Sequence, residues 1–183
     1  MAKPPRLLQS KIVAKSRLFT IEQMDLRFSN GVEVQYERLL GSANGAVLII
    51  PMRDDDTVLL IREYAAGVQR YELALPKGRI EDGESALQAA NREMMEEVGY
   101  GARKLTLLRS LTTSPSYLNH ATHIVLAQQL YPKKLEGDEP EEIEVVPWCL
   151  SELDTLLLQD ECSEARSIAA LFMARELLQK APS

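Results

Sequence analysis

The sequence has little positive charge, few cysteines and no long hydrophobic run. Its 183 residues include 27 acidic and 21 basic ones, giving a net charge of −6, whereas a protein that binds nucleic-acid backbones usually carries a basic stripe. The longest apolar stretch, residues 46–52, is too short to cross a bilayer. Residues 1–11 lack the apolar segment of a signal peptide. We therefore expect neither a nucleic acid nor a membrane as a partner.

Sulfur and imidazole ligands are also scarce. The two cysteines, Cys149 and Cys162, have no CxxC spacing and cannot make a disulfide framework, which favours a cytoplasmic protein. His120 and His123 are the only histidines, and they have no further ligands at the spacing of a zinc site. The overall composition, 45% hydrophobic and 26% charged, is that of an ordinary globular protein.

The strand and helix signals suggest two regions. β-Branched and aromatic residues alternate with polar ones over residues 12–40, and Asn30-Gly31 between the two runs predicts a hairpin. We expect residues 1–42 to form a small N-terminal antiparallel β region, with residues 1–11 as an irregular leader. Residues 43–183 mix strand-like runs with a few helical ones, which predicts an α/β domain with a mixed sheet covered on both faces.

One helix is clearly delimited over residues 85–98. Ser85 and Gln88 form a capping-box pattern at its start, and Gly99 fits a left-handed position after its end. Its apolar stripe repeats with the helical period and should pack on the sheet. The stripe consists of Leu87, Ala90, Met94 and Val98.

Three glutamates lie away from this stripe. Glu93, Glu96 and Glu97 are at positions i, i+3 and i+4, so their carboxylates converge on one side of the helix and repel one another. Clustered oxygens suit a hard cation such as Mg²⁺, although a solvated helix face has the same composition. The residues around the helix decide between these interpretations.

A longer pattern spans residues 78–100. It consists of a glycine, five residues, a glutamate, seven residues, Arg-Glu, two residues, Glu-Glu, one residue, a glycine and a bulky apolar residue. This pattern resembles the Nudix box of the Nudix hydrolase family, with a tyrosine where an aliphatic residue usually stands. Its fixed positions are Gly78, Glu84, Arg92, Glu93, Glu96, Glu97, Gly99 and Tyr100.

The resemblance implies a Nudix α/β/α sandwich and a hydrolase that uses divalent metal ions to cut a diphosphate linkage. Glu93 and Glu97 would be the main ligands of about two or three Mg²⁺ or Mn²⁺ ions. Glu96 would share or bridge these ions, and the backbone carbonyl of Lys77 would be a further ligand.

The remaining box residues are expected to support these ligands. Glu84 and Arg92 would pair and brace the helix against its loop, and Gly78 and Gly99 would serve the backbone geometry. We group Arg92, with Glu96, among the catalytic residues.

The general base is expected in a downstream loop, as in many family members that act on ADP-ribose. Residues 138–143 form an acidic run that resembles this loop. Glu139 is the expected base and Glu141 an additional metal contact, with Glu142 as the rival base. A solvated acidic loop is the alternative, because acidic runs are usually exposed.

The substrate-binding residues are expected from the same resemblance. Pro115 lies 16 residues after Gly99 and, with Tyr117, resembles the substrate loop of ADP-ribose pyrophosphatases. Arg62 is a candidate for binding phosphate and Tyr64 for stacking on adenine.

The whole length is similar to the branch of ADP-ribose pyrophosphatases and bacterial ADP-compounds hydrolases. This similarity implies a small nucleoside diphosphate substrate, such as ADP-ribose, diadenosine triphosphate, NADH or an ADP-sugar, with release of AMP. It also implies a homodimer.

Two alternatives stay open. Residues 75–78, Leu-Pro-Lys-Gly, resemble those of diadenosine-polyphosphate hydrolases, so a different nucleoside diphosphate derivative could be the substrate. A non-catalytic nucleotide-sensing Nudix protein is the second alternative. Such proteins commonly lose box glutamates, and all of them are present in this sequence.

Overall fold

The computed structural model describes residues 3–179, which divide into two compact units. The first unit runs to Gly45 and also includes Thr112–Ala121, whereas the second comprises Ala46–Leu111 and the chain from Thr122 onward. The inclusion of residues 112–121 in the first unit was not expected from the sequence, because pairing between distant segments leaves no local signal. None of the helices in the described residues has the length and hydropathy needed to cross a membrane.

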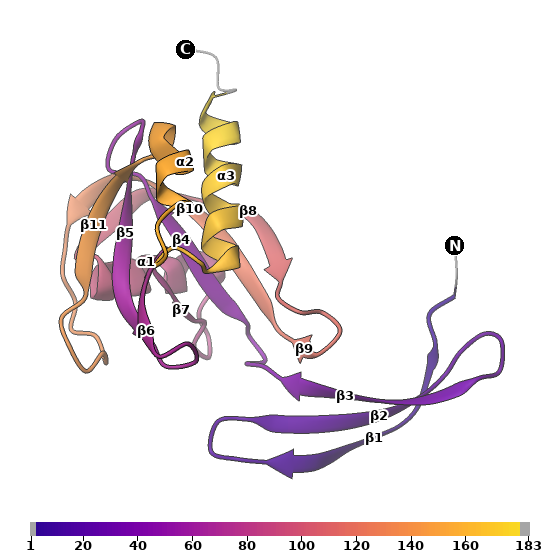
Figure 1. Ribbon diagram of the computed structural model, residues 1–183. Helices are drawn as coiled ribbons and strands as arrows, with labels where there is room; N and C mark the ends of the chain where they lie inside the picture. The colour runs from indigo at the N-terminus through magenta and orange to yellow at the C-terminus, as the bar shows by residue number, and fades with distance from the viewer. Residues whose placement is uncertain (1–2, 180–183) are drawn as a thin grey trace. The chain divides into compact units, whose positions relative to one another are not determined.

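The first unit is a sheet of four strands in the order β1-β2-β3-β9 (Figure 1). Its first three strands pair antiparallel, and β3 pairs parallel with β9. The strands are β1 (Arg6–Lys15), β2 (Thr20–Arg27), β3 (Glu33–Leu40) and β9 (Leu118–Asn119).

The hairpin between β2 and β3 is confirmed. Gly31 has a φ of +84°, a conformation that glycine adopts without strain, and Asn30 Oδ1 accepts a hydrogen bond from the backbone N of Val32. The predicted irregular leader is wrong from Arg6 onward, where β1 begins. The pairing of β1 with β2 has two register shifts, and such bulges interrupt the alternation by which a strand is recognised.

The second unit contains two further sheets, in the orders β7-β4-β10-β8 and β11-β5-β6. β4 pairs parallel with β10 but antiparallel with β7, and β5 pairs antiparallel with both of its neighbours. The strands are β4 (Ala46–Pro51), β5 (Thr57–Ala65), β6 (Arg70–Ala74), β7 (Lys77–Arg79), β8 (Tyr100–Thr112), β10 (Ala121–Pro132) and β11 (Glu144–Cys149).

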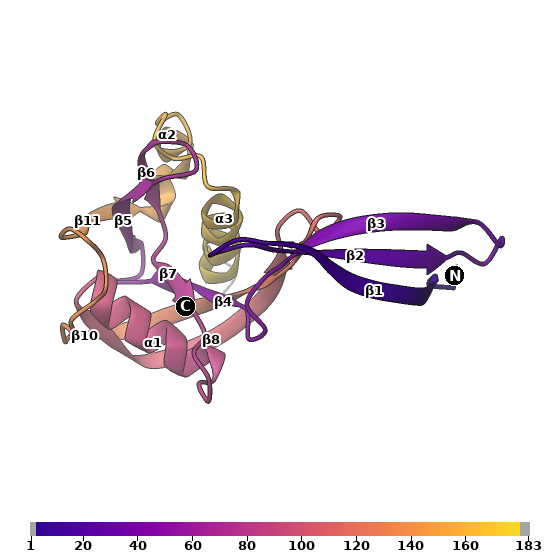
Figure 2. The same ribbon diagram turned by 90° about the horizontal axis from the view of Figure 1, so that it is seen from below.

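Two long helices flank these strands, and Figure 2 shows α1 and α3 on opposite sides of β4. The helical segments are α1 (Ala86–Glu97), the 3₁₀ turn η1 (Leu150–Glu152), the short α2 (Leu153–Leu156) and α3 (Ala165–Gln179). Between β11 and α3 the chain therefore has only a 3₁₀ turn and a single α-helical turn.

Successive side chains of β4 point to opposite faces of its sheet, and each face packs against a hydrophobic core. Ile49 packs in a cluster with Met94 of α1, whereas Leu48 packs in a second cluster with Leu171 of α3. All four side chains are at most 2% exposed, and full burial of such a side chain stabilises the fold by about 1.5–3 kcal/mol. The predicted α/β/α sandwich with a mixed sheet is confirmed.

Candidate active site

The acidic helix α1 is held at both ends as the sequence predicts. Ser85 is the N-cap, and both hydrogen bonds of the capping box with Gln88 are present. At the other end Gly99 has a φ of +79° and donates its N–H to the carbonyl of Met94. The helix therefore begins and ends at fixed points, which fixes the position of the glutamates along it.

Two glutamates of α1 are buried in spite of their charge. Glu97 is 4% exposed and its Oε2 accepts a hydrogen bond of 2.9 Å from the backbone N of Lys77. Burial, aided by the carboxylates of Glu63 and Glu93, raises the pKa of Glu97 to about 8. Burial likewise raises the pKa of Glu93 to about 7, aided by Glu96 and Glu139. Because burial disfavours the ionised carboxylates, a divalent cation that takes the place of their protons binds favourably at this site.

Arg92 connects three of the box carboxylates. Its Nε and Nη2 donate to the two oxygens of Glu84 over 2.8 and 3.0 Å, a bidentate pair. Its Nη1 donates to Glu93 over 2.9 Å and to Glu96 over 3.0 Å, and Nη2 also reaches the carbonyl of Arg79. The guanidinium holds the pKa of Glu84 below its usual range. Arg92 therefore braces the helix against the preceding loop, as the resemblance implied.

Gly78 leaves the space in which Glu93 lies. A Cβ atom built on Gly78 would stand 1.8 Å from the carboxyl carbon of Glu93, a distance that no real contact has. Gly78 lies in β7 and pairs with Val47 of β4, so its backbone is fixed by the sheet. The glycine at the start of the box is therefore required because a helix carboxylate rests directly on its backbone.

The acidic loop between β10 and β11 borders this helix. A cavity of about 420 Å³ is lined by Glu96, Lys134, Gly137, Glu139, Pro140, Glu141, Glu142 and Ile143. Of the loop glutamates, Glu139 is among the groups whose charge raises the pKa of Glu93. Glu141 Oε1 instead accepts a hydrogen bond of 2.8 Å from Tyr71 Oη. Glu139 therefore lies close enough to Glu93 for its charge to act on that carboxyl group. Glu141 is instead bound to Tyr71 of β6.

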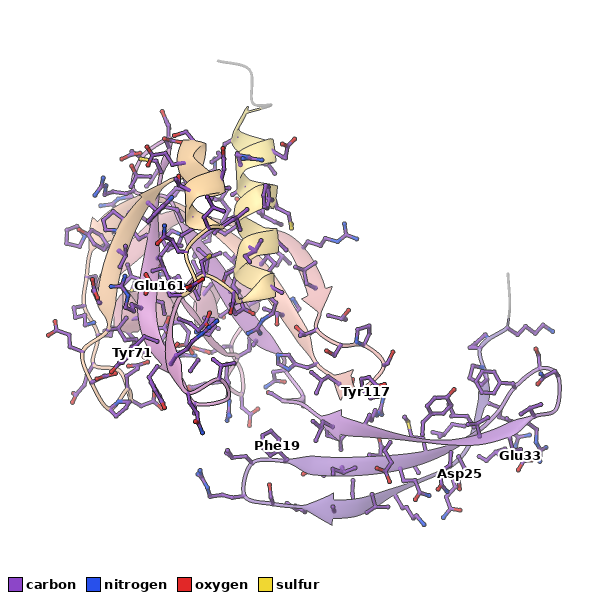
Figure 3. All side chains as sticks on the ribbon, in the orientation of Figure 1. Phe19, Asp25, Glu33, Tyr71, Tyr117 and Glu161 are labelled. Carbon is purple, nitrogen blue, oxygen red and sulfur yellow. The ribbon has the colours of Figure 1, made fainter. Side chains whose placement is uncertain are left out.

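Two expected substrate residues in the second unit already have protein partners. Arg62 donates two hydrogen bonds to Glu161, of 2.8 and 3.0 Å, and also pairs with Glu144. Tyr64 packs edge-on against Tyr71, with ring centroids 5.5 Å apart, and both rings are about half exposed. Figure 3 labels Tyr71 and Glu161 on this unit. Arg62 therefore links its own strand, β5, and strand β11 to the segment before α3. The ring of Tyr64 stays accessible to solvent.

The other two expected substrate residues belong to the first unit. Pro115 follows Ser114, whose φ is +50°, and the carbonyl of Tyr117 accepts a hydrogen bond of 2.8 Å from the backbone N of Leu39. The side chain of Tyr117, labelled in Figure 3, is 69% exposed. The backbone of this loop is therefore fixed by β3 while its aromatic ring is free to bind.

Sequence reasoning missed Glu63 and Lys134. Glu63 Oε2 accepts a hydrogen bond of 2.6 Å from Lys77 Nζ, and Lys134 Nζ donates to the backbone carbonyl of Glu96. The alternation of β5 could have found Glu63, because Ile61 two residues earlier packs against the α1 side of the sheet. No local pattern marks Lys134.

These residues fit a divalent cation. Within residues 3–179 no three carboxylate, imidazole or thiol groups converge to enclose a metal ion by themselves. Mg²⁺ does not require this, because it usually binds one or two carboxylates and completes its coordination with water and substrate phosphate. Glu93 and Glu97 provide two buried carboxylates with raised pKa values, and Lys77 provides a carbonyl on the neighbouring strand.

Comparison with known proteins identifies both parts of the chain. The NUDIX domain matches residues 43–172, and the NudE-type Nudix hydrolase N-terminal domain matches residues 5–38. The chain is 50% identical over 175 residues to the ADP compounds hydrolase NudE of Escherichia coli (strain K12), which covers 96% of this chain and 94% of that protein. It is 29% identical over 180 residues to the ADP-ribose pyrophosphatase of Bacillus subtilis (strain 168), covering 94% and 97% of the two chains. A crystal structure of an ADP compounds hydrolase matches with a TM-score of 0.91 and 49% identity, over 98% of this chain and 96% of that chain.

Proposed function

This chain belongs to the Nudix hydrolase family as a pyrophosphohydrolase, and we propose that it hydrolyses the diphosphate bond of ADP-linked compounds and releases AMP. The observation that carries the proposal is the pair of buried carboxylates, Glu93 and Glu97, whose pKa values are raised to about 7 and about 8 on a helix fixed at both ends. A relative with 50% identity is an ADP compounds hydrolase, which supports this substrate class.

The residues divide the chemistry between binding and proton transfer. Glu93, Glu97 and the carbonyl of Lys77 would hold the divalent cations, Mg²⁺ or Mn²⁺, and Glu96 would share them. Such cations would supply charge neutralisation for the diphosphate and a lower pKa for water. Glu139 accepts the proton of the water that attacks phosphorus. The bridging phosphorus–oxygen bond breaks as the new one forms, and AMP leaves with one of the two phosphates.

The accessible tyrosines are the proposed binding groups for the nucleoside. Tyr64 and Tyr117 each expose about half of their surface or more, and an exposed aromatic ring can stack on adenine. Pro115 restricts the backbone beside Tyr117. Arg62 supports the position of Tyr64 by fixing β5 to Glu144 and Glu161, rather than through a free guanidinium.

Diadenosine polyphosphates are the second candidate substrates, because a specific contact favours them. Lys77 stands directly before the first box glycine, and its ammonium group lies 2.6 Å from Glu63 Oε2. A cation beside Glu97 suits a longer, more negative phosphate chain. The two substrate groups are distinguished by relative kcat/KM values.

We also propose that the protein is a homodimer formed through its N-terminal sheet. Part of one face of this sheet is apolar, since the register pairs Leu7 with Leu26, Leu26 with Val34 and Met24 with Tyr36. Leu7 is 52% exposed and Tyr36 is 44% exposed, and contiguous exposed apolar surface marks interaction sites. Light scattering of the purified protein tests this, with Leu26→Glu expected to give a monomer.

A cytoplasmic location is consistent with the thiols. Cys149 and Cys162 are both free, and burial raises the pKa of each thiol, which keeps them unreactive. Fractionation of cells that express the protein tests this proposal.

A substrate panel tests the proposed reaction. ADP-ribose, NADH, diadenosine triphosphate, ADP-glucose and GDP-mannose are incubated with the protein and Mg²⁺, and the products are identified by chromatography. We expect AMP from the first four and little turnover of the guanosine compound. No hydrolysis of any compound, together with tight nucleotide binding, would instead favour the nucleotide-sensing function.

A further inference from the structure

The segment that follows β10 lies against the C-terminal end of α1. The backbone N of Leu135 donates to the carbonyl of Met95 over 3.1 Å, and the backbone N of Lys133 donates to the carbonyl of Gly99 over 3.0 Å. Between them, Lys134 Nζ donates to the carbonyl of Glu96 over 2.5 Å. Carbonyls in the last turn of a helix have no partner within the helix, so this segment supplies partners for two of them.

Lys134 also supplies a charge that the helix lacks. The last turn of α1 contains no basic residue, although cations stabilise the negative end of a helix. The stem of Lys134 lies over Gly99, where an added Cβ would be 3.6 Å from Lys134 Cδ. The side chain therefore crosses the end of the helix before its ammonium group reaches Glu96.

The anchored segment leads directly into the acidic loop. Gly137 follows Lys134 by three residues, and a Cβ built on it would stand 2.1 Å from Glu139 Oε2. Gly137 is not among the described glycines with positive φ, so a larger residue there would act by displacing Glu139 rather than by straining the backbone. Of the described residues that line the cavity, Lys134 is the one cation, and four others are the carboxylates Glu96, Glu139, Glu141 and Glu142.

We propose that Lys134 is a positioning residue that fixes the acidic loop to the end of α1 and so sets where Glu139 stands relative to the metal-binding glutamates. This inference rests on the proposed role of Glu139 as general base. The ammonium group of Lys134 donates to the backbone carbonyl of Glu96, so in this proposal it acts on turnover through the position of Glu139.

The test is a double-mutant cycle between the two residues. Lys134→Met removes the ammonium group and keeps the length of the stem, and it is measured alone and in a Glu139→Gln background. We expect kcat to fall about fivefold to tenfold in the first case, as for the loss of one charge-assisted hydrogen bond, with KM little changed. In the Glu139→Gln background the same substitution should change kcat less than twofold, roughly within the error of independent effects.

Three further variants separate positioning from a general structural effect. Lys134→Arg should restore most of the turnover, since a guanidinium can donate to the same carbonyl. Lys133→Met removes the same charge one residue earlier, where only the backbone N–H is used, and should leave kcat unchanged. Gly137→Ala should lower kcat without lowering the melting temperature, because it displaces the Glu139 carboxylate.

The results separate a failure of the positioning role of Lys134 from a failure of the proposed function. Equal losses of kcat for Lys134→Met in both backgrounds, or no loss at all, would overturn the positioning role while leaving the hydrolase intact. A Glu139→Gln variant with wild-type kcat would instead remove Glu139 as the base. The positioning role of Lys134 would then be overturned as well, because it acts through Glu139.

Discussion

The backbone N–H of Lys77 donates a hydrogen bond to Glu97 Oε2 over 2.9 Å, which joins the strand before the box to the last glutamate of the helix. The two residues are 20 positions apart, and the contact brings the expected carbonyl ligand against an expected carboxylate ligand. The proposed metal site therefore depends on β7 lying beside α1, and it should be sensitive to any change that separates them.

In the absence of bound metal, the free energy of unfolding should decrease as the pH rises. The pKa values of Glu93 and Glu97 are raised from 4.5 to about 7 and about 8 in the folded protein. Above 4.5 the unfolded chain loses these protons while the folded chain retains them, so the metal-free protein should lose stability as the pH rises toward about 8. Urea unfolding with EDTA across this range measures the effect.

Saturating Mg²⁺ provides the control for this pH dependence. With the cation bound, the carboxylates are ionised in the folded state and the loss of stability should largely disappear. A metal-free protein whose stability rises over the same range would contradict the raised pKa values.

Arg92→Lys should destabilise the second unit. A lysine cannot make the bidentate pair with Glu84 and also reach Glu93 and Glu96, so we expect a loss of about 2 kcal/mol in the free energy of unfolding. Arg53→Lys is the matched control, because the pair of Arg53 with Asp54 is exposed and should be worth less than about 0.5 kcal/mol. Denaturant unfolding of both variants compares the two; equal effects would argue against the bracing role.

Gly78→Ala should weaken metal binding more than folding. The added methyl group would occupy the position of the Glu93 carboxylate and displace it, so we expect the Mg²⁺ concentration for half-maximal rate to rise about tenfold or more, as for changes around metal ligands. Gly67→Ala is the control, since a Cβ there meets nothing within 4 Å. Metal titrations of turnover measure both, and an unchanged Mg²⁺ requirement in Gly78→Ala would show that Glu93 is not a ligand.

The three loop glutamates should differ in their effect on turnover. Glu139→Gln should lower kcat about 100-fold or more, as expected for loss of a general base. Glu141→Gln should cost about fivefold at most, because Glu141 is engaged by Tyr71 through a single hydrogen bond. A larger loss for Glu141→Gln or Glu142→Gln than for Glu139→Gln in steady-state kinetics would transfer the role of base to that residue.

The parts of the fold that depend on local sequence could be predicted, and those that depend on distant pairing could not. The caps of α1 at Ser85 and Gly99 were visible because capping uses residues within one turn. The start of β1 at Arg6 was missed because the bulges hide its alternation.

The same distinction holds within the site. The box spacing located Glu93 and Glu97 because one helix carries both. Lys134 was not predicted because its contact with Glu96 joins residues 38 positions apart, and an isolated exposed lysine has no pattern of its own. Arg62 was expected to bind phosphate, and its pairing with Glu161 spans 99 positions, which sequence periodicity cannot show.

The most direct test of the central claim is Mg²⁺-dependent AMP release from ADP-ribose by the wild type and by Glu97→Gln, measured side by side. A glutamine can still accept the hydrogen bond from Lys77 but cannot serve as an anionic ligand, so the fold should persist, with an unchanged far-UV circular dichroism spectrum. We predict that the variant releases AMP at least ~100-fold more slowly at saturating substrate, since bound cations contribute several kcal/mol to such reactions. A folded Glu97→Gln protein that releases AMP at the wild-type rate would contradict the account.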